Sequence, residues 1–183
     1  SIPYAAQIPN SLLFKDVNVD GETFSLISDN KTTILFDPLI KKGIVKFVVQ
    51  SLNSLVEVGI ADETVKYERK EFPDARGQDK IVQYDWNGDI CHIGDFITGN
   101  AEFNTGDRVA LELNMDSSPR TLTFFVNDEE QPNYVSNIPA SVRALLWCKG
   151  EAFKVLKFEA LSAPTAKHGA GSHAWEYGTK WVK

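Results

Sequence analysis

The chain is poor in the residues that hold metals, form disulfides or act as nucleophiles. Its 183 residues include two cysteines, three histidines and one methionine. Cys91 and Cys148 lie in no Cys-x-x-Cys or His-spaced pattern, so the sequence predicts reduced thiols rather than a zinc site or a disulfide. Gly-rich phosphate loops and calcium-loop patterns are also missing from the sequence. We therefore expect no metal and no cofactor.

Long apolar runs and an excess of basic residues are absent as well. No segment approaches the run of about 18 apolar residues that a membrane helix needs, and the N-terminus lacks a charged segment followed by an apolar one. The formal net charge of −6 disfavours binding to a phosphate backbone, because such binding depends on clustered Lys and Arg. We expect no membrane and no nucleic-acid partner, and an intracellular, cytoplasmic protein with the nucleus as the alternative location.

Alternation of apolar and polar residues is what the sequence does have, most clearly between Gly106 and Val126. This period of two is typical of strands with one buried face, and the polar residues 116–120 between the two runs predict a β-hairpin. Similar runs and turn signals, such as Asn87-Gly88, recur along the chain and give about eleven or twelve short strands and no helix of ten or more residues. The predicted fold is a single all-β, antiparallel sandwich. The residues that share a face in the hairpin are Val109, Leu111 and Leu113, followed by Leu122, Phe124 and Val126.

The same hairpin resembles the signature of SPRY domains. The resemblance consists of Gly106-Asp107, an aliphatic strand ending near Asp116, the Phe-rich run 122–127, and the Asn-Ile-Pro segment 137–139, in matching order and spacing. It covers roughly residues 43 to 160. It implies a concanavalin-like SPRY jelly roll at residues 23–162, preceded by an N-terminal arm at 1–22 and followed by a C-terminal linker or tail at 163–183.

Two features depart from the family pattern. Asp128 stands where SPRY domains usually have Gly, and since Asp tolerates positive φ less well than Gly, we expect a longer or differently shaped turn there. The run Gly171–Tyr177 is similar to the Gly-x-His-x-Trp-Glu motif that the family carries on an early strand, but here it follows a linker-like composition over 163–171. The tail could begin another copy in a longer parent, fold back on the sandwich, or match by coincidence.

The resemblance implies a non-enzymatic module that binds a protein or peptide partner through loops at one end of the sandwich, in the way of a recruiting or scaffold part of a larger protein. The loop that follows Val56–Ala61 is Asp62–Lys80 in this chain. Trp147 resembles the Trp of a Trp-Gly pair that lines a peptide pocket in SOCS-box-linked SPRY proteins, with a buried core Trp as the alternative, and we expect Trp86 to be structural. The candidate ligand-binding residues are Tyr67, Arg69, Asp74, Arg76, Trp147 and Cys148; the partner and the oligomeric state stay open.

Two other functions remain as alternatives. A carbohydrate-binding, lectin-like module would share this strand density and use Trp and Tyr as platforms. Catalysis comes third: Glu112, Asn114 and Asp116 alternate on one strand, but the middle residue is Asn, so we expect a solvated face rather than a glycosidase pair. Cys91 and His92 are adjacent on a strand and point to opposite faces, which disfavours a nucleophile–base pair. We expect no catalytic residues.

Overall fold

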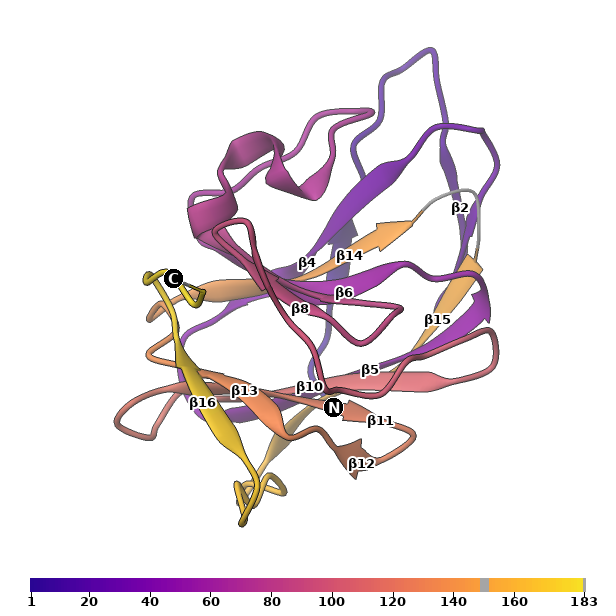
Figure 1. Ribbon diagram of the computed structural model, residues 1–183. Helices are drawn as coiled ribbons and strands as arrows, with labels where there is room; N and C mark the ends of the chain where they lie inside the picture. Colours follow the sequence, from indigo (N-terminus) through magenta and orange to yellow (C-terminus); the bar gives the residue numbers. More distant parts are fainter. Residues whose placement is uncertain (149–151, 183) are drawn as a thin grey trace.

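This computed structural model describes residues 1–148 and 152–182 of the chain. These residues contain sixteen strands and two short 3-10 helices, joined by turns and loops (Figure 1). The strand count exceeds the expected eleven or twelve because several are only two to four residues long. The elements are β1 (Ala5–Gln7), β2 (Val17–Asp20), β3 (Thr23–Leu26), β4 (Thr32–Ile40), β5 (Ile44–Asn53), β6 (Glu57–Asp62), η1 (Pro73–Arg76), η2 (Gln78–Lys80), β7 (Ile81–Asp85), β8 (Ile90–His92), β9 (Asp95–Ile97), β10 (Arg108–Asn114), β11 (Thr121–Val126), β12 (Glu129–Glu130), β13 (Asn133–Ser136), β14 (Val142–Cys148), β15 (Ala152–Leu161) and β16 (His173–Glu176).

These strands form two sheets that pack face to face. One has seven strands in the order β1-β4-β14-β6-β7-β8-β9; the other has nine, in the order β16-β13-β11-β10-β5-β15-β3-β2 with β12 beside β11. Neighbouring strands are antiparallel except β13 and β16, which run parallel. The predicted antiparallel β-sandwich is confirmed, and so is the predicted hairpin, whose strands β10 and β11 pair over their whole length.

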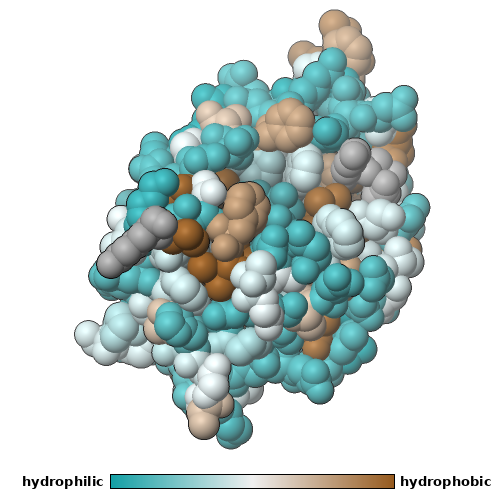
Figure 2. Space-filling view, in the orientation of Figure 1, coloured by the Kyte–Doolittle hydropathy of each residue, from teal (hydrophilic) through white to brown (hydrophobic). Residues whose placement is uncertain are grey.

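An aromatic layer fills the space between the sheets. Phe36 on β4 is fully buried, with its ring centroid 5.1 Å from that of Phe47 on β5 and 5.8 Å from that of Phe24 on β3. Such edge-on and tilted pairs are favoured by the charge distribution of aromatic rings. Alternation accounts for the rest of the layer, because Leu111 and its cross-strand partner Phe124 both face inward. Hydrophilic side chains cover most of the face seen in Figure 2, and hydrophobic ones gather in smaller areas.

The turn between β11 and β12 contains two residues, so the expected longer or differently shaped turn is wrong. Asn127 and Asp128 both have positive φ, 48° and 69°, as the two centres of a type I′ turn require. Short polar side chains tolerate this region, and both of these form hydrogen bonds. Asn127 Oδ1 accepts a hydrogen bond from the Arg108 backbone N–H, and Asp128 forms an ion pair of 2.8 Å with the Arg108 guanidinium.

The C-terminal tail folds back on the nine-stranded sheet, which is one of the three alternatives left by the sequence. β16 pairs with β13 along its length, and the preceding segment lies across the outer face of the sheet. The carboxylate of Glu112, only 1% exposed, accepts hydrogen bonds from the backbone N–H groups of Thr165 and Ala166. The expected solvated face at Glu112 is therefore wrong, because the tail covers it.

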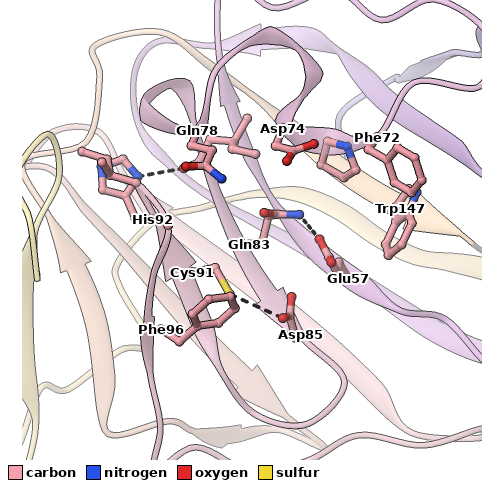
Figure 3. Close-up of a pocket in the computed structure, with 14 residues that line it drawn as sticks. Glu57, Phe72, Asp74, Gln78, Gln83, Asp85, Cys91, His92, Phe96 and Trp147 are labelled. Carbon is pink, nitrogen blue, oxygen red and sulfur yellow. Dashed lines mark hydrogen bonds between the residues drawn. The ribbon is translucent and has the colours of Figure 1, made fainter. Parts of the chain in front are cut away.

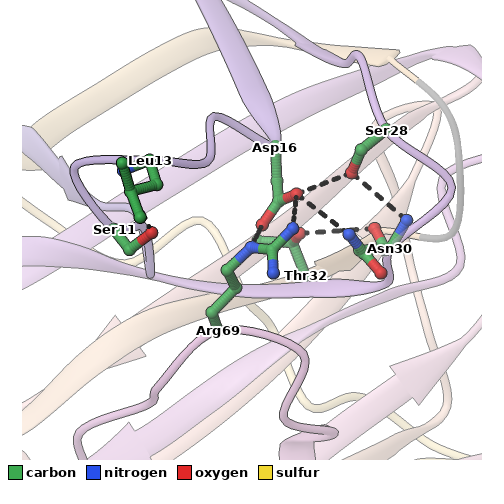
Figure 4. Close-up of polar contacts among 7 residues, drawn as sticks. All are labelled: Ser11, Leu13, Asp16, Ser28, Asn30, Thr32 and Arg69. Carbon is green, nitrogen blue, oxygen red and sulfur yellow. Dashed lines mark hydrogen bonds and ion pairs between the residues drawn. The ribbon is translucent and has the colours of Figure 1, made fainter.

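The N-terminal residues also join the sheets, since β1 pairs with β4 and β2 pairs with β3. Between β1 and β2, Asp16 is buried and accepts hydrogen bonds from Ser28 and Asn30 (Figure 4). The same carboxylate receives two N–H groups from Arg69 at 2.6 and 3.0 Å, a bidentate pair in which the planar guanidinium matches the carboxylate. The arm is thus tied to the long connection between β6 and β7.

We expect Phe36→Ala to lower the free energy of unfolding by about 3–5 kcal/mol, because it leaves a cavity in the aromatic layer. Chemical denaturation would measure the change. Phe14→Ala is the matched control, since Phe14 is 53% exposed, and it should cost far less. Similar losses for the two variants would contradict the packing described above.

Candidate functional site

A cleft of about 220 Å³ opens on the outer face of the seven-stranded sheet, beneath the connection between β6 and β7. Residues of β6, β7, β8 and β14 form its floor, and residues of η1, the turn before it and the β8–β9 turn form its walls. The connection, drawn in magenta in Figure 1, lies over this end of the sheet. The cleft is therefore built by the sheet and by the loop that the sequence singled out.

Strand register places the polar floor of the cleft. Glu57 on β6 is the cross-strand partner of both Asp85 on β7 and Trp147 on β14. Gln83 on β7 is the partner of Cys91 on β8. Cross-strand partners share a face of the sheet, so all five side chains face the cleft.

Aromatic rings stand on two sides of this floor (Figure 3). On one side Phe72, 45% exposed, lies with its ring centroid 5.7 Å from that of Trp147, and the planes are tilted by 51°. On the other side Phe96 is 56% exposed and lies beside Cys91. The Lys31 ammonium stands 4.8 Å from the centroid of Phe72 and 5.8 Å from that of Trp147. The cleft thus has a carboxyl-bearing floor between aromatic walls.

Glu57 and Asp85 form a carboxyl pair in which Glu57 holds a proton. Burial and the neighbouring Asp85 raise the pKa of Glu57 from its ordinary value to about 9. Burial also raises the pKa of Asp85, while the side-chain hydrogen bond from Cys91 opposes this rise. Gln83 Nε2 donates to Glu57, and Cys91 Sγ lies 3.4 Å from Asp85 Oδ2 as donor. Among the described residues, Asp85 Oδ1 is buried without a hydrogen-bond donor, and the Trp147 Nε1–H is buried without an acceptor.

Of the six residues predicted from the sequence, Asp74 and Trp147 line the cleft. Asp74 is exposed on η1, and Trp147 is partly buried on β14. Cys148, next to Trp147, points to the other face of the sheet and is buried in the main core, as alternation requires. The two residues of the pair therefore cannot act on one face together.

The other three predicted residues support the loop. Tyr67 is 7% exposed and packs in a second core cluster with residues such as Leu145, while its hydroxyl donates to the Pro73 carbonyl at 2.5 Å. Arg69 is bound to Asp16, as described above, and Arg76 forms an ion pair of 2.6 Å with Glu71. The burial of Tyr67 follows from its position in the cluster beneath the connection.

The sequence interpretation missed Glu57, Gln83, Asp85, Phe72 and Phe96. A signal was present in two places: in 81–85 and 57–61 the apolar residues alternate with these polar ones, so the polar positions had to face outward. The pairing of β6 with β7 brings Glu57 and Asp85 together. The two strands are joined by a connection of about twenty residues, and the local sequence pattern does not specify that they pair.

Trp86 differs from its expected structural role, since it is 50% exposed. It lines a separate cleft of about 430 Å³ together with Leu55 and Phe103. Both cysteines are thiols, as predicted, and both are buried. In the residues that the structure describes, no group of three His, Cys, Asp or Glu side chains could hold a metal ion, and no helix could cross a membrane.

His92, in the lining of the cleft, contacts three residues of the C-terminal tail. Its Nδ1 lies 2.8 Å from the Ile81 carbonyl and its Nε2 accepts the Gly178 backbone N–H at 2.9 Å. The ring lies 4.4 Å from that of Tyr177 and 5.1 Å from that of Trp181, centroid to centroid. Nδ1 therefore carries the proton of a neutral imidazole, and burial lowers the pKa of His92 below its ordinary value.

Comparison with known proteins supports the fold. No family model matches the sequence, and no curated protein matches it. The fold is similar to the SPRY domain of human HERC1, with a TM-score of 0.60 and 20% identity over 77% of this chain and 92% of that one. A human SPRY domain gives 0.61 and 18% over 82% and 98%, and the TRIM65 PSpry domain gives 0.62 and 10% over 81% and 85%. The chain has the fold of SPRY domains, as its sequence signature predicted.

We expect Glu57→Gln to stabilise the fold at alkaline pH. Because the pKa of Glu57 is raised in the folded state, folding favours the protonated form, and stability falls as pH rises from about 4.5 toward 9. Gln stays neutral and keeps a donor for Asp85, so the variant should exceed the parent by about 1–3 kcal/mol at pH 8.5 and by little at pH 4.5. Urea denaturation at both pH values would measure this. Glu129→Gln, at an exposed position on β12, is the control and should show no such difference.

His92 should make the stability sensitive to acid. Its pKa is lowered by folding, so as pH falls below about 6.5 the unfolded chain takes up the proton first and stability is lost. His92→Gln keeps an acceptor for the Gly178 N–H but cannot be protonated, and should lose about 1 kcal/mol less than the parent between pH 7.5 and 5. Equal losses in the two proteins would show that His92 does not titrate on unfolding.

Proposed function

We propose that this protein is a non-enzymatic protein-interaction module that binds a short segment of a partner protein in the cleft described above. The observation that supports this most strongly is the pair of exposed aromatic rings, Phe72 and Phe96, on either side of a recess whose floor is fixed by strand pairing. Exposed aromatic side chains around a preformed recess are typical of the centres of protein interfaces. The three similar folds are SPRY domains, whose name alone identifies no partner.

In this proposal Trp147, Phe72 and Phe96 are the apolar anchors, and Asp74 is the polar group at the rim. Arg69 and Arg76 act indirectly, since each is paired with a carboxylate that holds the connection in place. Tyr67 and Cys148 support the wall and the floor from within the core. Binding by these four residues themselves stays a prediction, as does an intracellular location.

The structure gives the alternatives less support. A sugar ring stacks on a flat aromatic surface, whereas the rings of Phe72 and Trp147 are tilted by 51°. A glycosidase needs two carboxyl groups about 5 Å or more apart with the substrate between them, whereas Glu57 and Asp85 are cross-strand partners that lie side by side on the floor of the cleft. Glu112, Asn114 and Asp116 all bind backbone N–H groups of the chain itself.

Peptides selected from a random linear library against the folded protein would test the proposal. We expect Trp147→Ala to weaken the selected peptides by about 2 kcal/mol or more, because an interface Trp in a recess is commonly a dominant contact. Trp86→Ala, which removes an exposed Trp outside the cleft, should leave their affinity unchanged. Arg76→Glu should also weaken binding, since it replaces the ion pair with Glu71 by repulsion.

Thermal unfolding of the same variants separates binding from folding. Trp147→Ala should lower the melting temperature by no more than a few degrees, because its ring lies at the cleft and outside the main aromatic layer. A large loss of stability, or selected peptides that bind both Trp variants equally well, would refute the cleft as the binding site.

A further inference from the structure

The charges that face the cleft have one sign. Glu57, Asp74 and Asp85 line it, and no Lys or Arg stands among the described residues that do so. The nearby basic side chains are outside this lining: Arg69 is bound to Asp16, Arg76 is bound to Glu71, and Lys31 stands over the rings of Phe72 and Trp147. A cleft with walls of low polarity concentrates the field of such charges and attracts a group of opposite charge.

The aromatic wall provides independent evidence for a positive group. The Lys31 ammonium, from the turn before β4, stands over the rings of Phe72 and Trp147 at 4.8 and 5.8 Å from their centroids. Cation–π contacts of this kind are attractive by about 0.5–1 kcal/mol at exposed sites and by more when desolvated. One face of this wall therefore already binds an ammonium group.

One carboxylate oxygen of the floor lacks a donor. Asp85 Oδ1 is buried and has no hydrogen-bond partner among the described residues, whereas Asp85 Oδ2 accepts from Cys91 Sγ and Glu57 accepts from Gln83 Nε2. A buried carboxylate oxygen without a donor is unfavourable, and charge-assisted bonds to it are the strong ones. Lysine and arginine side chains have only donors to offer, which is the complement of this floor.

We infer that the bound segment inserts a lysine or arginine side chain into the cleft, an inference that rests on the proposed function. The aliphatic stem lies between Phe72 and Phe96, and the charged end meets Asp85 and Glu57. Asp74 on η1 closes over it from the rim. Long basic side chains bury their stems against apolar surface while their charged ends find partners, which suits a recess of about 220 Å³.

Proton release accompanies this binding. The incoming cation takes the place of the Glu57 proton, which is released to solvent. Glu57 loses this proton more readily as the pH rises, so the affinity for the cation rises with pH. His92, also in the lining, stays neutral because burial lowers its pKa, and the Lys31 ammonium is held over the rings of Phe72 and Trp147. The other titratable groups around the pair are Tyr67, Asp74, Asp89 and Cys91.

Selection of random linear peptides on phage, followed by calorimetry with the synthetic peptides, tests the inference. We expect one position to be enriched in Lys or Arg, and replacement of that residue by norleucine to weaken binding about tenfold or more. Calorimetry in two buffers of different ionisation enthalpy should show a proton released, and the Lys peptide should bind more tightly at pH 8.5 than at pH 6.

Charge variants locate the effect. In the double variant Glu57→Gln with Asp85→Asn the Lys and norleucine peptides should bind about equally. The double variant Asp20→Asn with Glu129→Gln makes the same two kinds of substitution at exposed positions of the other sheet and should keep the full preference. Asp74→Asn changes an exposed side chain on η1, so the variant should fold; it should reduce the preference and serves if the first double variant does not fold.

The outcomes separate this inference from the proposed function. Peptides that lose binding in Trp147→Ala but favour acidic or apolar residues at every position would overturn the inference and leave the binding cleft in place. A basic preference that persists in Asp74→Asn and in the Glu57/Asp85 double variant would also overturn it. If no selected peptide depends on Trp147, both the proposed function and this inference are wrong.

Discussion

The packing of aromatic and aliphatic side chains between the two sheets is the interaction on which the rest of the structure depends. Successive side chains of a strand point to opposite faces of the sheet, so when one residue packs in this layer, its two neighbours in the strand face outward. Val58 and Ile60 on β6, with Val82 and Tyr84 on β7, are all buried in the core. Glu57 and Asp85 therefore have to face outward, and the pairing of the two strands puts them side by side. The chemistry of the cleft is a consequence of how the core is filled.

A cover over that outer face turns two surface carboxyl groups into a desolvated pair. The connection from β6 to β7 is rich in charge, yet it is fixed by its own small core, where Val65 and Tyr67 pack against Leu145 and Ile81. Its partial burial of Glu57 is what raises the pKa of that residue. A loop with charged composition thus behaves as an ordered wall, because a few apolar residues in it are enough to anchor it to the sheet.

Local patterning was enough to predict the fold class and its central hairpin, since period-two alternation and turn residues are encoded within a few positions. At Gly59 on β6 a Cβ would collide with the Val82 backbone, so the close approach of β6 and β7 requires a glycine at this position. The site depends on contacts between residues far apart in the sequence, and these escaped prediction. Glu112 is covered by a segment 53 positions further along the chain, and the sequence of β10 gives no sign of this contact.

The bond between Asp16 and Arg69 has a practical meaning for anyone who shortens this chain. Residues at the beginning look dispensable, because the family signature starts well after them. Yet the carboxylate that binds Arg69 in the connection between β6 and β7 belongs to this opening stretch, 53 positions before its guanidinium partner. Deleting the stretch would leave the partly buried Arg69 guanidinium without its carboxylate and loosen the connection between β6 and β7. The folded unit thus extends beyond the residues that carry the SPRY signature.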